Sequence, residues 1–184
     1  METDDFRTTE MKRKAFIKEI ISWILVIGVG FLLAWFVTRV IIIKAVVPTE
    51  SMDPTIMVGD KIIGNRLAYL FSDPERGDII IFKYSETENY VKRIIGLPGE
   101  TVTFEDGKVF IDGVALDEDY VHGKDTLPDK QDTYVVPEDS YFMLGDNRTN
   151  SADSRYWEGS PFISEDAIKG KVWFRYSPSW GTIK

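Results

Sequence analysis

The sequence contains no cysteine and a single histidine, His122. Disulfides, thiolate catalysis and cysteine-based zinc sites are therefore excluded. One imidazole is too few for a histidine-rich metal site, and a Ser–His–Asp triad could be built only around His122 itself. Because His122 lies in a polar stretch, we interpret it as a solvated surface residue. We therefore predict that the protein uses no metal and no cofactor.

The sequence also lacks the basic excess that nucleic-acid partners favour. Residues 44–184 carry 16 basic and 25 acidic side chains, a net charge of −9, whereas residues 1–19 are balanced. This acidic part predicts no nucleic-acid partner. Hydrophobic residues make up 43% of the chain and aromatic residues 13%, which argues against disorder. Beyond the N-terminal apolar segment about 140 residues remain, which is enough for one domain with its own core.

Charge is missing altogether from residues 20–38, IISWILVIGVGFLLAWFVT. At ~1.5 Å per residue, a helix of this length spans a hydrocarbon core of ~30 Å. Trp23 and Trp35 lie near its ends, as interfacial aromatic residues do, and Arg39 can extend its side chain to the interface. The run is longer than a signal-peptide core of ~7–15 residues, and no small-x-small cleavage site follows it. We predict an uncleaved transmembrane anchor over residues 20–43.

Basic residues flank this anchor unequally. Five of them lie within residues 1–19, and only Arg39 and Lys44 follow closely on the other side. The positive-inside rule then predicts a cytosolic tail at residues 1–19 and an extracytoplasmic domain at residues 44–184. We therefore expect a single-pass protein of the cell membrane whose folded domain lies on the outer face.

The segments after Lys44 are short, rich in Val, Ile, Phe and Tyr, and separated by Gly, Pro and Asp. One of them contains Asp-Gly between alternating apolar residues, which is a strong hairpin signal. Only residues 163–169 favour a short helix, with Ser164 as its N-cap, and residues 114–133 indicate an exposed excursion. The predicted fold is mostly β, with antiparallel sheets forming a folded-over or barrel-like catalytic domain after one N-terminal transmembrane helix. The predicted strands are 78–84, 89–97, 100–113 (the hairpin), 132–137, 140–146 and 170–178.

Two stretches of the outer domain can carry chemistry together. PTESMDPT (48–55) places Ser51 among turn-forming residues, and NYVKRIIGLPGE (89–100) places Lys92 inside an apolar strand. A serine hydroxyl needs an adjacent base to act as a nucleophile. Lysine is a base only when neutral, so its pKa must fall from ~10.4, and burial among apolar residues lowers it. Taken singly, Ser51 reads as a turn residue and Lys92 as a solvated strand residue.

Two further stretches, RGDIIIF (76–82) and GDNRTNSADSR (145–155), change that interpretation. Together with SMDPT and KRIIGLPGE, they resemble in order the sequence boxes of bacterial type I signal peptidases, also called leader peptidases. The resemblance covers the anchor and nearly all of residues 44–176. The single anchor and the short excursion are similar to the compact Gram-positive-type branch. This resemblance implies a membrane-bound serine endopeptidase that removes signal peptides from exported preproteins after an Ala-x-Ala-like site.

The resemblance also implies a role for each residue of the site. Ser51 attacks the scissile carbonyl, and Lys92 takes its proton as the general base. The backbone N–H of Ser51 and the hydroxyl of Thr49 hold the oxyanion. Ser151 hydrogen-bonds the Lys92 amine and orients it. The remaining residues brace the site, with Asp153 and Arg155 as an ion pair and with Asp146, Asn147 and Arg148 shaping the turn that carries Ser151.

An extended peptide can add as a strand beside the residues before Ser51 and those around Lys92, so that alternate side chains face the enzyme. Bulky neighbours then leave shallow pockets that admit Ala and exclude Leu or Phe. The site lies a few residues beyond the anchor, so it can meet a signal peptide whose apolar core is still in the lipid bilayer. Trp173, Phe174 and Trp180 are expected to help rest the domain on the lipid. The residues expected to line the pockets are Val47, Met52, Ile56, Tyr90 and Val91.

Two other functions stay open on the residues alone. A self-cleaving repressor shares the Ser–Lys chemistry and a β-rich fold, but it lacks this anchor and needs a DNA-binding domain, which the sequence does not display. A non-enzymatic anchored β-domain would be unaffected when Ser51 loses its hydroxyl. Cleavage of a preprotein by the purified protein in detergent discriminates among these functions.

Overall fold

The computed structural model describes residues 2–121 and 125–183. His122 lies outside the described residues. Contacts between residues divide the chain into two units, Met1–Ile41 and Ile42–Lys184.

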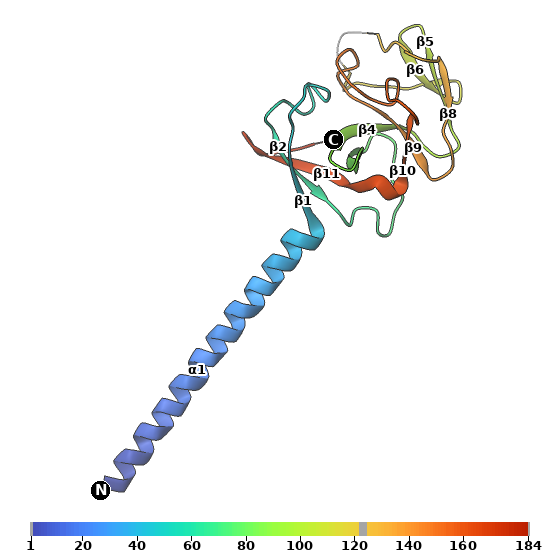
Figure 1. The fold of residues 1–184 in the computed structure, drawn as a ribbon. Coiled ribbons are helices and arrows are strands. Elements are labelled where there is room, and N and C mark those ends of the chain that lie inside the picture. The colour runs from blue at the N-terminus through green and yellow to red at the C-terminus, as the bar shows by residue number, and fades with distance from the viewer. Residues whose placement is uncertain (1, 122–124, 184) are drawn as a thin grey trace. The chain divides into compact units, whose positions relative to one another are not determined.

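The first unit is one long helix (Figure 1). α1 covers Glu2–Phe36 and continues into the π-helical turn η1, Val37–Ile41. Thr38 donates its hydroxyl to the carbonyl oxygen of Ala34 at 2.8 Å, which satisfies one acceptor at the helix end. The segment Arg13–Ile41 is long and apolar enough to cross a membrane, and the residues of its most apolar stretch are not buried in the protein. Apolar side chains without a protein cover are what a lipid-facing helix requires.

The anchor predicted from the sequence extended to residue 43, but the helical part ends at Ile41. Ile42 and Ile43 begin strand β1, and Ile43 is buried in the core of the second unit. The apolar run 40–43 is therefore shared between the helix end and a strand. Both environments select the same apolar residues, so the boundary cannot be seen in composition.

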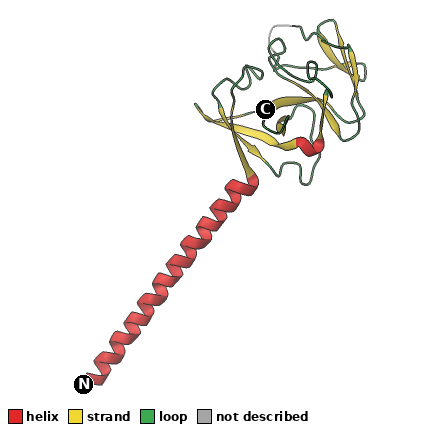
Figure 2. Cartoon of the chain, viewed as in Figure 1, coloured by secondary structure: helices red, strands yellow, loops and turns green. Residues whose placement is uncertain are grey.

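The second unit contains two antiparallel sheets, as expected for a mostly β fold (Figure 2). The larger sheet has the order β1-β2-β11-β3-β4-β9-β10, and β12 pairs with β11. Register shifts interrupt the pairing of β11 with both neighbours and of β4 with β9. Such bulges increase the local twist, so the sheet curls into an open barrel-like form. The strands are β1 Ile42–Val46, β2 Lys61–Asn65, β3 Ile79–Lys83, β4 Asn89–Gly96, β9 Ser140–Leu144, β10 Phe162–Ser164, β11 Ile168–Ser177 and β12 Gly181–Thr182.

The smaller sheet has the order β7-β6-β5-β8. Its central hairpin turns at Asp106 and Gly107, whose φ angles are 48° and 74°. Two successive positive φ values are what a type I′ turn requires, so the Asp-Gly hairpin prediction is confirmed. The strands are β5 Thr101–Glu105, β6 Lys108–Ile111, β7 Val114–Ala115 and β8 Thr133–Val135.

Strand β3 is buried on both of its faces, which explains why its sequence is continuously apolar. Ile79 and Ile81 point into one core cluster, which also contains Met52, whereas Ile80 and Phe82 point into another on the opposite face. A strand that is buried on both faces has no polar side, so it shows no alternation. A third cluster joins the small sheet to β4 and β9. Lys92, the catalytic candidate on β4, is thus held in a strand that pairs with β3.

The short helix predicted over residues 163–169 is wrong in extent. Strand β10 includes Ser164, a three-residue 3-10 helix η2 covers Glu165–Ala167, and β11 begins at Ile168. Ser164 makes no side-chain capping bond. Pairing of Ile163 with Tyr141 across β10 and β9 outweighs the local helical preference.

Candidate active site

Ser51 and Lys92 meet although 41 residues separate them in the chain. The Lys92 amine donates to Ser51 Oγ at 2.7 Å and to the carbonyl oxygen of Val91 at 3.2 Å. Both side chains are buried, with exposed fractions of 6% for Ser51 and 4% for Lys92. When the amine is neutral, the same short distance lets the hydroxyl donate to nitrogen. The pair therefore has the geometry of a nucleophile and its base.

The surroundings of Lys92 favour the neutral amine. Burial penalises the ammonium and lowers the pKa of Lys92 from 10.5 to about 8, and the carboxylates of Asp153 and Asp146 oppose this shift. Lys92 on β4 pairs with Ile80 on β3, and Ile80 is fully buried in the core. Desolvation is the larger effect, and it gives the amine a pKa that suits a base near neutral pH.

The turn that carries Ser51 is fixed from below by Met52 and Ile56, both fully buried. The backbone amide of Ile56 donates to the Met52 carbonyl at 2.8 Å. At the start of the loop, the Val47 amide donates to Asp60 O at 2.9 Å, and the Gly59 amide donates to Val47 O at 2.8 Å. The apolar anchors and these bonds hold the Ser51 backbone in place.

Thr49 lies beside the nucleophile, with its Oγ1 3.3 Å from Ser51 Oγ. Among the described residues, the backbone N–H of Ser51 has no acceptor. The Ser51 N–H and the Thr49 hydroxyl thus lie close to each other, and two such donors can stabilise an oxyanion.

The segment 145–155 holds the Ser51 turn from the side. The Asn147 backbone amide donates to Ser51 O at 3.1 Å, and its side-chain amide donates to Glu50 O at 3.1 Å. Asn150 adds a bond from its side-chain amide to the Glu50 carboxylate at 3.0 Å. Two bonds therefore fix the carbonyl groups of Glu50 and Ser51, and a third fixes the Glu50 side chain.

Two buried bidentate ion pairs brace this segment. Arg155 donates to both carboxylate oxygens of Asp153 at 2.9 Å, and Asp153 also accepts the Gly145 amide at 3.1 Å. Arg93 donates to both oxygens of Asp146 at 2.9 and 2.7 Å. The second pair was not foreseen from the sequence, although Arg93 directly follows Lys92 in the KRIIG stretch.

Ser151 does not make the hydrogen bond expected from the sequence. Its hydroxyl is buried and has no partner among the described residues, because the Lys92 amine is directed at Ser51 and Val91 instead. Gly145 lies against it: a Cβ added to Gly145 would collide with the Ser151 hydroxyl and with the Ser51 carbonyl oxygen. The space between the 145–155 segment and the Ser51 turn therefore admits only glycine at position 145.

A cavity of about 370 Å³ opens at the Ser–Lys pair. Four of the five predicted pocket residues line it, but Ile56 is fully buried beneath the turn. Ile56 packs in the core because the turn after Ser51 directs it inward, next to Met52. Four lining residues were not predicted from the sequence, namely Pro48, Glu88, Asn150 and Ala152. The lining comprises Val47, Pro48, Thr49, Ser51, Met52, Glu88, Tyr90, Val91, Lys92, Asn150 and Ala152.

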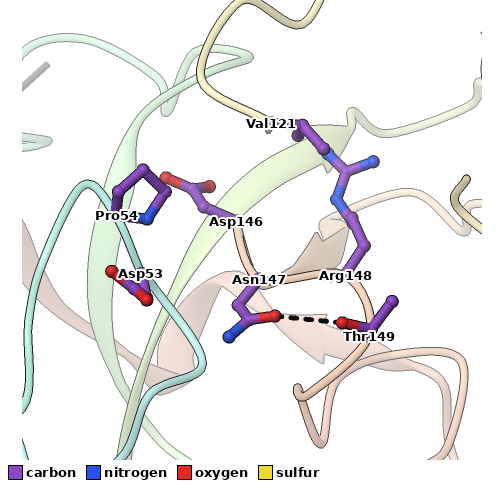
Figure 3. Close-up of a pocket in the computed structure, with 7 residues that line it drawn as sticks. All are labelled: Asp53, Pro54, Val121, Asp146, Asn147, Arg148 and Thr149. Atoms are coloured by element: carbon purple, nitrogen blue, oxygen red, sulfur yellow. Dashed lines mark hydrogen bonds between the residues drawn. The ribbon is translucent and has the colours of Figure 1, made fainter. Parts of the chain in front are cut away.

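A second cavity, of about 380 Å³, lies between the 53–54 turn and the 146–149 turn (Figure 3). Thr149 donates its hydroxyl to Asn147 Oδ1 there at 3.3 Å. Three charged residues line it, namely Asp53, Asp146 and Arg148. Two of them already have a partner, Asp146 in Arg93 and Arg148 in Glu118. Over residues 2–121 and 125–183, no group of His, Cys, Asp or Glu is arranged to hold a metal ion.

Comparison with known proteins decides the family. A model of the family described as "Signal peptidase, peptidase S26" matches residues 10–180. The signal peptidase IB of Staphylococcus aureus strain COL is 34% identical over 177 residues, 88% of this chain and 91% of that protein. The chain belongs to the S26 signal peptidases.

The chain is also similar to two other proteins. A probable signal peptidase I-2 of Synechocystis is 36% identical over 139 residues, 72% of this chain and 62% of that protein. The crystal structure of a signal peptidase I from Enterococcus faecalis V583 is 37% identical, covers 54% of this chain and 97% of that chain, and has a TM-score of 0.46. The Gram-positive-type resemblance seen in the sequence is confirmed. The chain is thus a type I signal peptidase, a serine peptidase that removes signal peptides, and its apolar N-terminal helix fits a membrane-anchored enzyme.

In this signal peptidase the segment 114–133 is more than an exposed excursion. Arg148 is paired with Glu118 and donates to the buried Thr126 hydroxyl at 2.8 Å. The Arg93 guanidinium stacks over the Tyr120 ring, with Arg93 Cζ 3.9 Å from the centre of that ring. Most of the described residues of this segment are exposed, as predicted, and its polar side chains also supply partners for buried arginines. The only sequence signal for this arrangement is the excess of acidic and hydroxyl residues in the segment.

Proposed function

We propose that this signal peptidase cleaves preproteins with Ser51 as nucleophile and neutral Lys92 as general base. The observation that carries the proposal is the buried 2.7 Å contact between the amine and the hydroxyl. Ser51 Oγ attacks the scissile carbonyl carbon while its proton passes to Lys92. The ammonium then returns this proton to the leaving amine, which yields an acyl-enzyme. Water, deprotonated by the same amine, releases the signal peptide and regenerates Ser51.

The oxyanion of each tetrahedral intermediate is assigned to two donors, the backbone N–H of Ser51 and the Thr49 hydroxyl. The position of Thr49 beside Ser51 Oγ supports this assignment. Donors that are fixed before the reaction stabilise the developing charge without reorganisation. We assign Asp153, Arg155, Asp146, Asn147 and Arg148 to holding the Ser51 turn, and Ser151 to orienting the amine during the reaction.

The substrate is proposed to bind as an extended strand between residues 47–50 and 88–91. Alternate side chains then face the cavity, at the first and third positions before the scissile bond. Val47, Met52, Tyr90 and Val91 narrow the cavity at those positions, which supports an Ala-x-Ala preference. A substrate panel tests this: Phe at the position before the scissile bond should abolish cleavage, and equal rates for Ala and Phe would contradict it.

We further propose that residues 1–19 are cytosolic and that the peptidase domain faces outward. The excess of basic residues before the helix supports this orientation. The bilayer is the second partner, and a ladder of three aromatic rings, two of them exposed, can rest on it. Trp173 stacks on Phe174 with ring centres 6.3 Å apart, and Phe174 stacks on Trp180 at 5.7 Å. Stacked, exposed indoles suit the headgroup region.

The catalytic assignment is tested by cleavage of a preprotein with purified enzyme in detergent. Ser51→Ala and Lys92→Arg should each abolish cleavage, because an arginine side chain stays protonated. Thr49→Val, which removes only the hydroxyl, should lower kcat by about 10²–10³-fold if that hydroxyl is an oxyanion donor. Lys83→Arg, on the neighbouring strand and partly exposed, is the matched control and should leave the rate unchanged. Substantial activity in Lys92→Arg would show that another group is the base.

A further inference from the structure

The loop between β2 and β3 exposes apolar side chains that nothing in its own domain covers. In this 66–73 loop, RLAYLFSD, Leu70 is 60% exposed and Phe71 is 94% exposed. Phe71 is the most exposed large hydrophobic side chain among the described residues. Leu67 adds a third exposed apolar group. An apolar tip of this kind is a candidate for contact with a partner or a membrane.

The loop has a defined conformation that directs these groups outward. Asn65 accepts the Leu67 amide through its side-chain oxygen at 2.9 Å, and the Leu70 amide donates to Leu67 O at 3.2 Å. Tyr69, one residue before the exposed pair, turns inward and donates its hydroxyl to Asp78 at 2.8 Å. Asp78 is also ion-paired with Lys171 of β11. With Tyr69 fixed to the sheet, Leu70 and Phe71 are presented at the loop tip.

The strand register places this loop at one end of the β1–β2 ladder. Ile42 pairs with Asn65, and Val46 pairs with Lys61 at the other end, from which the chain continues to Ser51. Arg66 donates its Nε to the carbonyl oxygen of Ile42 at 3.3 Å. Figure 1 shows the loop after β2 leaving the sheet at the end where β1 begins. The loop therefore starts one strand spacing, about 4.8 Å, from Ile42.

Ile42 directly follows Ile41, the last residue of the segment that can cross a membrane. Where that segment spans a bilayer, Ile42 lies at the outer interface, and covalent connection alone brings the start of the 66–73 loop there. The interfacial layer is about 5–7 Å thick on each side, comparable with the depth of one phenyl ring. Arg66 at the start of the loop suits lipid phosphates, which bind guanidinium groups well.

We propose that the 66–73 loop is a membrane attachment additional to the helix and the aromatic ladder, and that it inserts Leu70 and Phe71 into the outer interface of the bilayer. This inference rests on the membrane anchorage proposed above. One helix leaves a domain free to rotate about the helix axis, and contacts of the domain itself with the bilayer restrict that freedom. The loop thereby holds the catalytic cavity at a constant height and direction relative to membrane-inserted signal peptides.

The absence of cysteine allows a direct test on the full chain, because one introduced thiol can be labelled uniquely. Phe71→Cys, labelled with the environment-sensitive dye NBD, is reconstituted into phosphatidylcholine and phosphatidylglycerol vesicles that contain lipids with a shallow nitroxide. Val135→Cys on the small sheet, 65% exposed, is the matched control, and Leu33→Cys in the helix reports anchorage. We expect blue-shifted, strongly quenched emission at positions 71 and 33 and neither effect at 135.

A quenched label at 33 with a label at 71 as water-exposed as that at 135 would overturn the proposal and leave anchorage standing. No quenching at either 33 or 71 would reject anchorage and the loop attachment together. Neither result concerns Ser51 or Lys92, so the catalytic assignment is tested separately. Phe71→Ser should raise KM for a vesicle-bound preprotein several-fold and leave peptide cleavage in detergent unchanged. Equal loss in both media would mean that the loop acts only through folding, against the proposal.

Discussion

The buried amine of Lys92 predicts a specific dependence of activity on pH. With a pKa of about 8, the amine is neutral in about 9% of molecules at pH 7, whereas at the ordinary value of 10.5 it would be neutral in about 0.03%. Burial therefore increases the usable base about 300-fold at neutral pH. Because only the neutral amine accepts the Ser51 proton, activity should rise with pH and reach a plateau once the amine is deprotonated.

The assay is kcat/KM for a signal-peptide substrate in detergent, measured from pH 6 to pH 10. The logarithm should rise with a slope of one below pH 8 and level off above it. Ser51→Ala supplies the blank, and His122→Asn removes the only imidazole, so its profile should match that of the wild type. A midpoint near 10.5 would show that Lys92 is not desolvated. A midpoint near 6.5 that disappears in His122→Asn would make histidine the base and refute the reasoning.

Four further predictions concern the stability of the fold, the turnover rate and the orientation in the membrane. Lys92→Met should raise the free energy of unfolding at pH 7 by up to about 3 kcal/mol, and this gain should vanish as the pH rises from 8 to 10.5, because in that range the unfolded wild-type chain binds a proton that the folded chain does not. Urea unfolding at pH 7 and at pH 10 measures the difference between the two proteins, and a difference that does not depend on pH would contradict the prediction. Asp153→Ala should cost about 3–5 kcal/mol by stranding the buried Arg155, whereas Glu86→Ala, at an exposed pair, should leave Tm unchanged. Ser151→Ala should lower kcat but not Tm, since its hydroxyl has no partner to lose in the described part of the free enzyme, and unchanged turnover would count against an orienting role. Protease added outside right-side-out vesicles should cut within residues 114–133, and protection of that segment would reverse the proposed orientation.

Several features of this protein follow from local sequence alone. The membrane helix is visible because an uncharged run of nineteen residues is a property of consecutive positions. The hairpin at Asp106 and Gly107 is equally local, since positive φ is a property of the residues themselves. The strands around Ile80 and Lys92 were expected from their β-branched composition, and the structure confirms them. The pairing of Ser51 with Lys92 came from the family resemblance rather than from either residue.

Other features depend on which distant residues come together, so only the tertiary structure decides them. Apolar composition is the same for an anchor, a cavity wall and a core, and packing alone sends Ile43 and Ile56 into the core. Within the 163–169 segment, Ile163 and Ser164 pair with β9 and Ile168 pairs with β3, so long-range strand pairing replaces a local helix. Arg93 and Asp146 are 53 positions apart, and nothing near either one identifies its partner. The inward direction of Lys92, and with it the lowered pKa, likewise arises from strands folded around it, because desolvation is produced by the whole neighbourhood and not by the residues next in sequence.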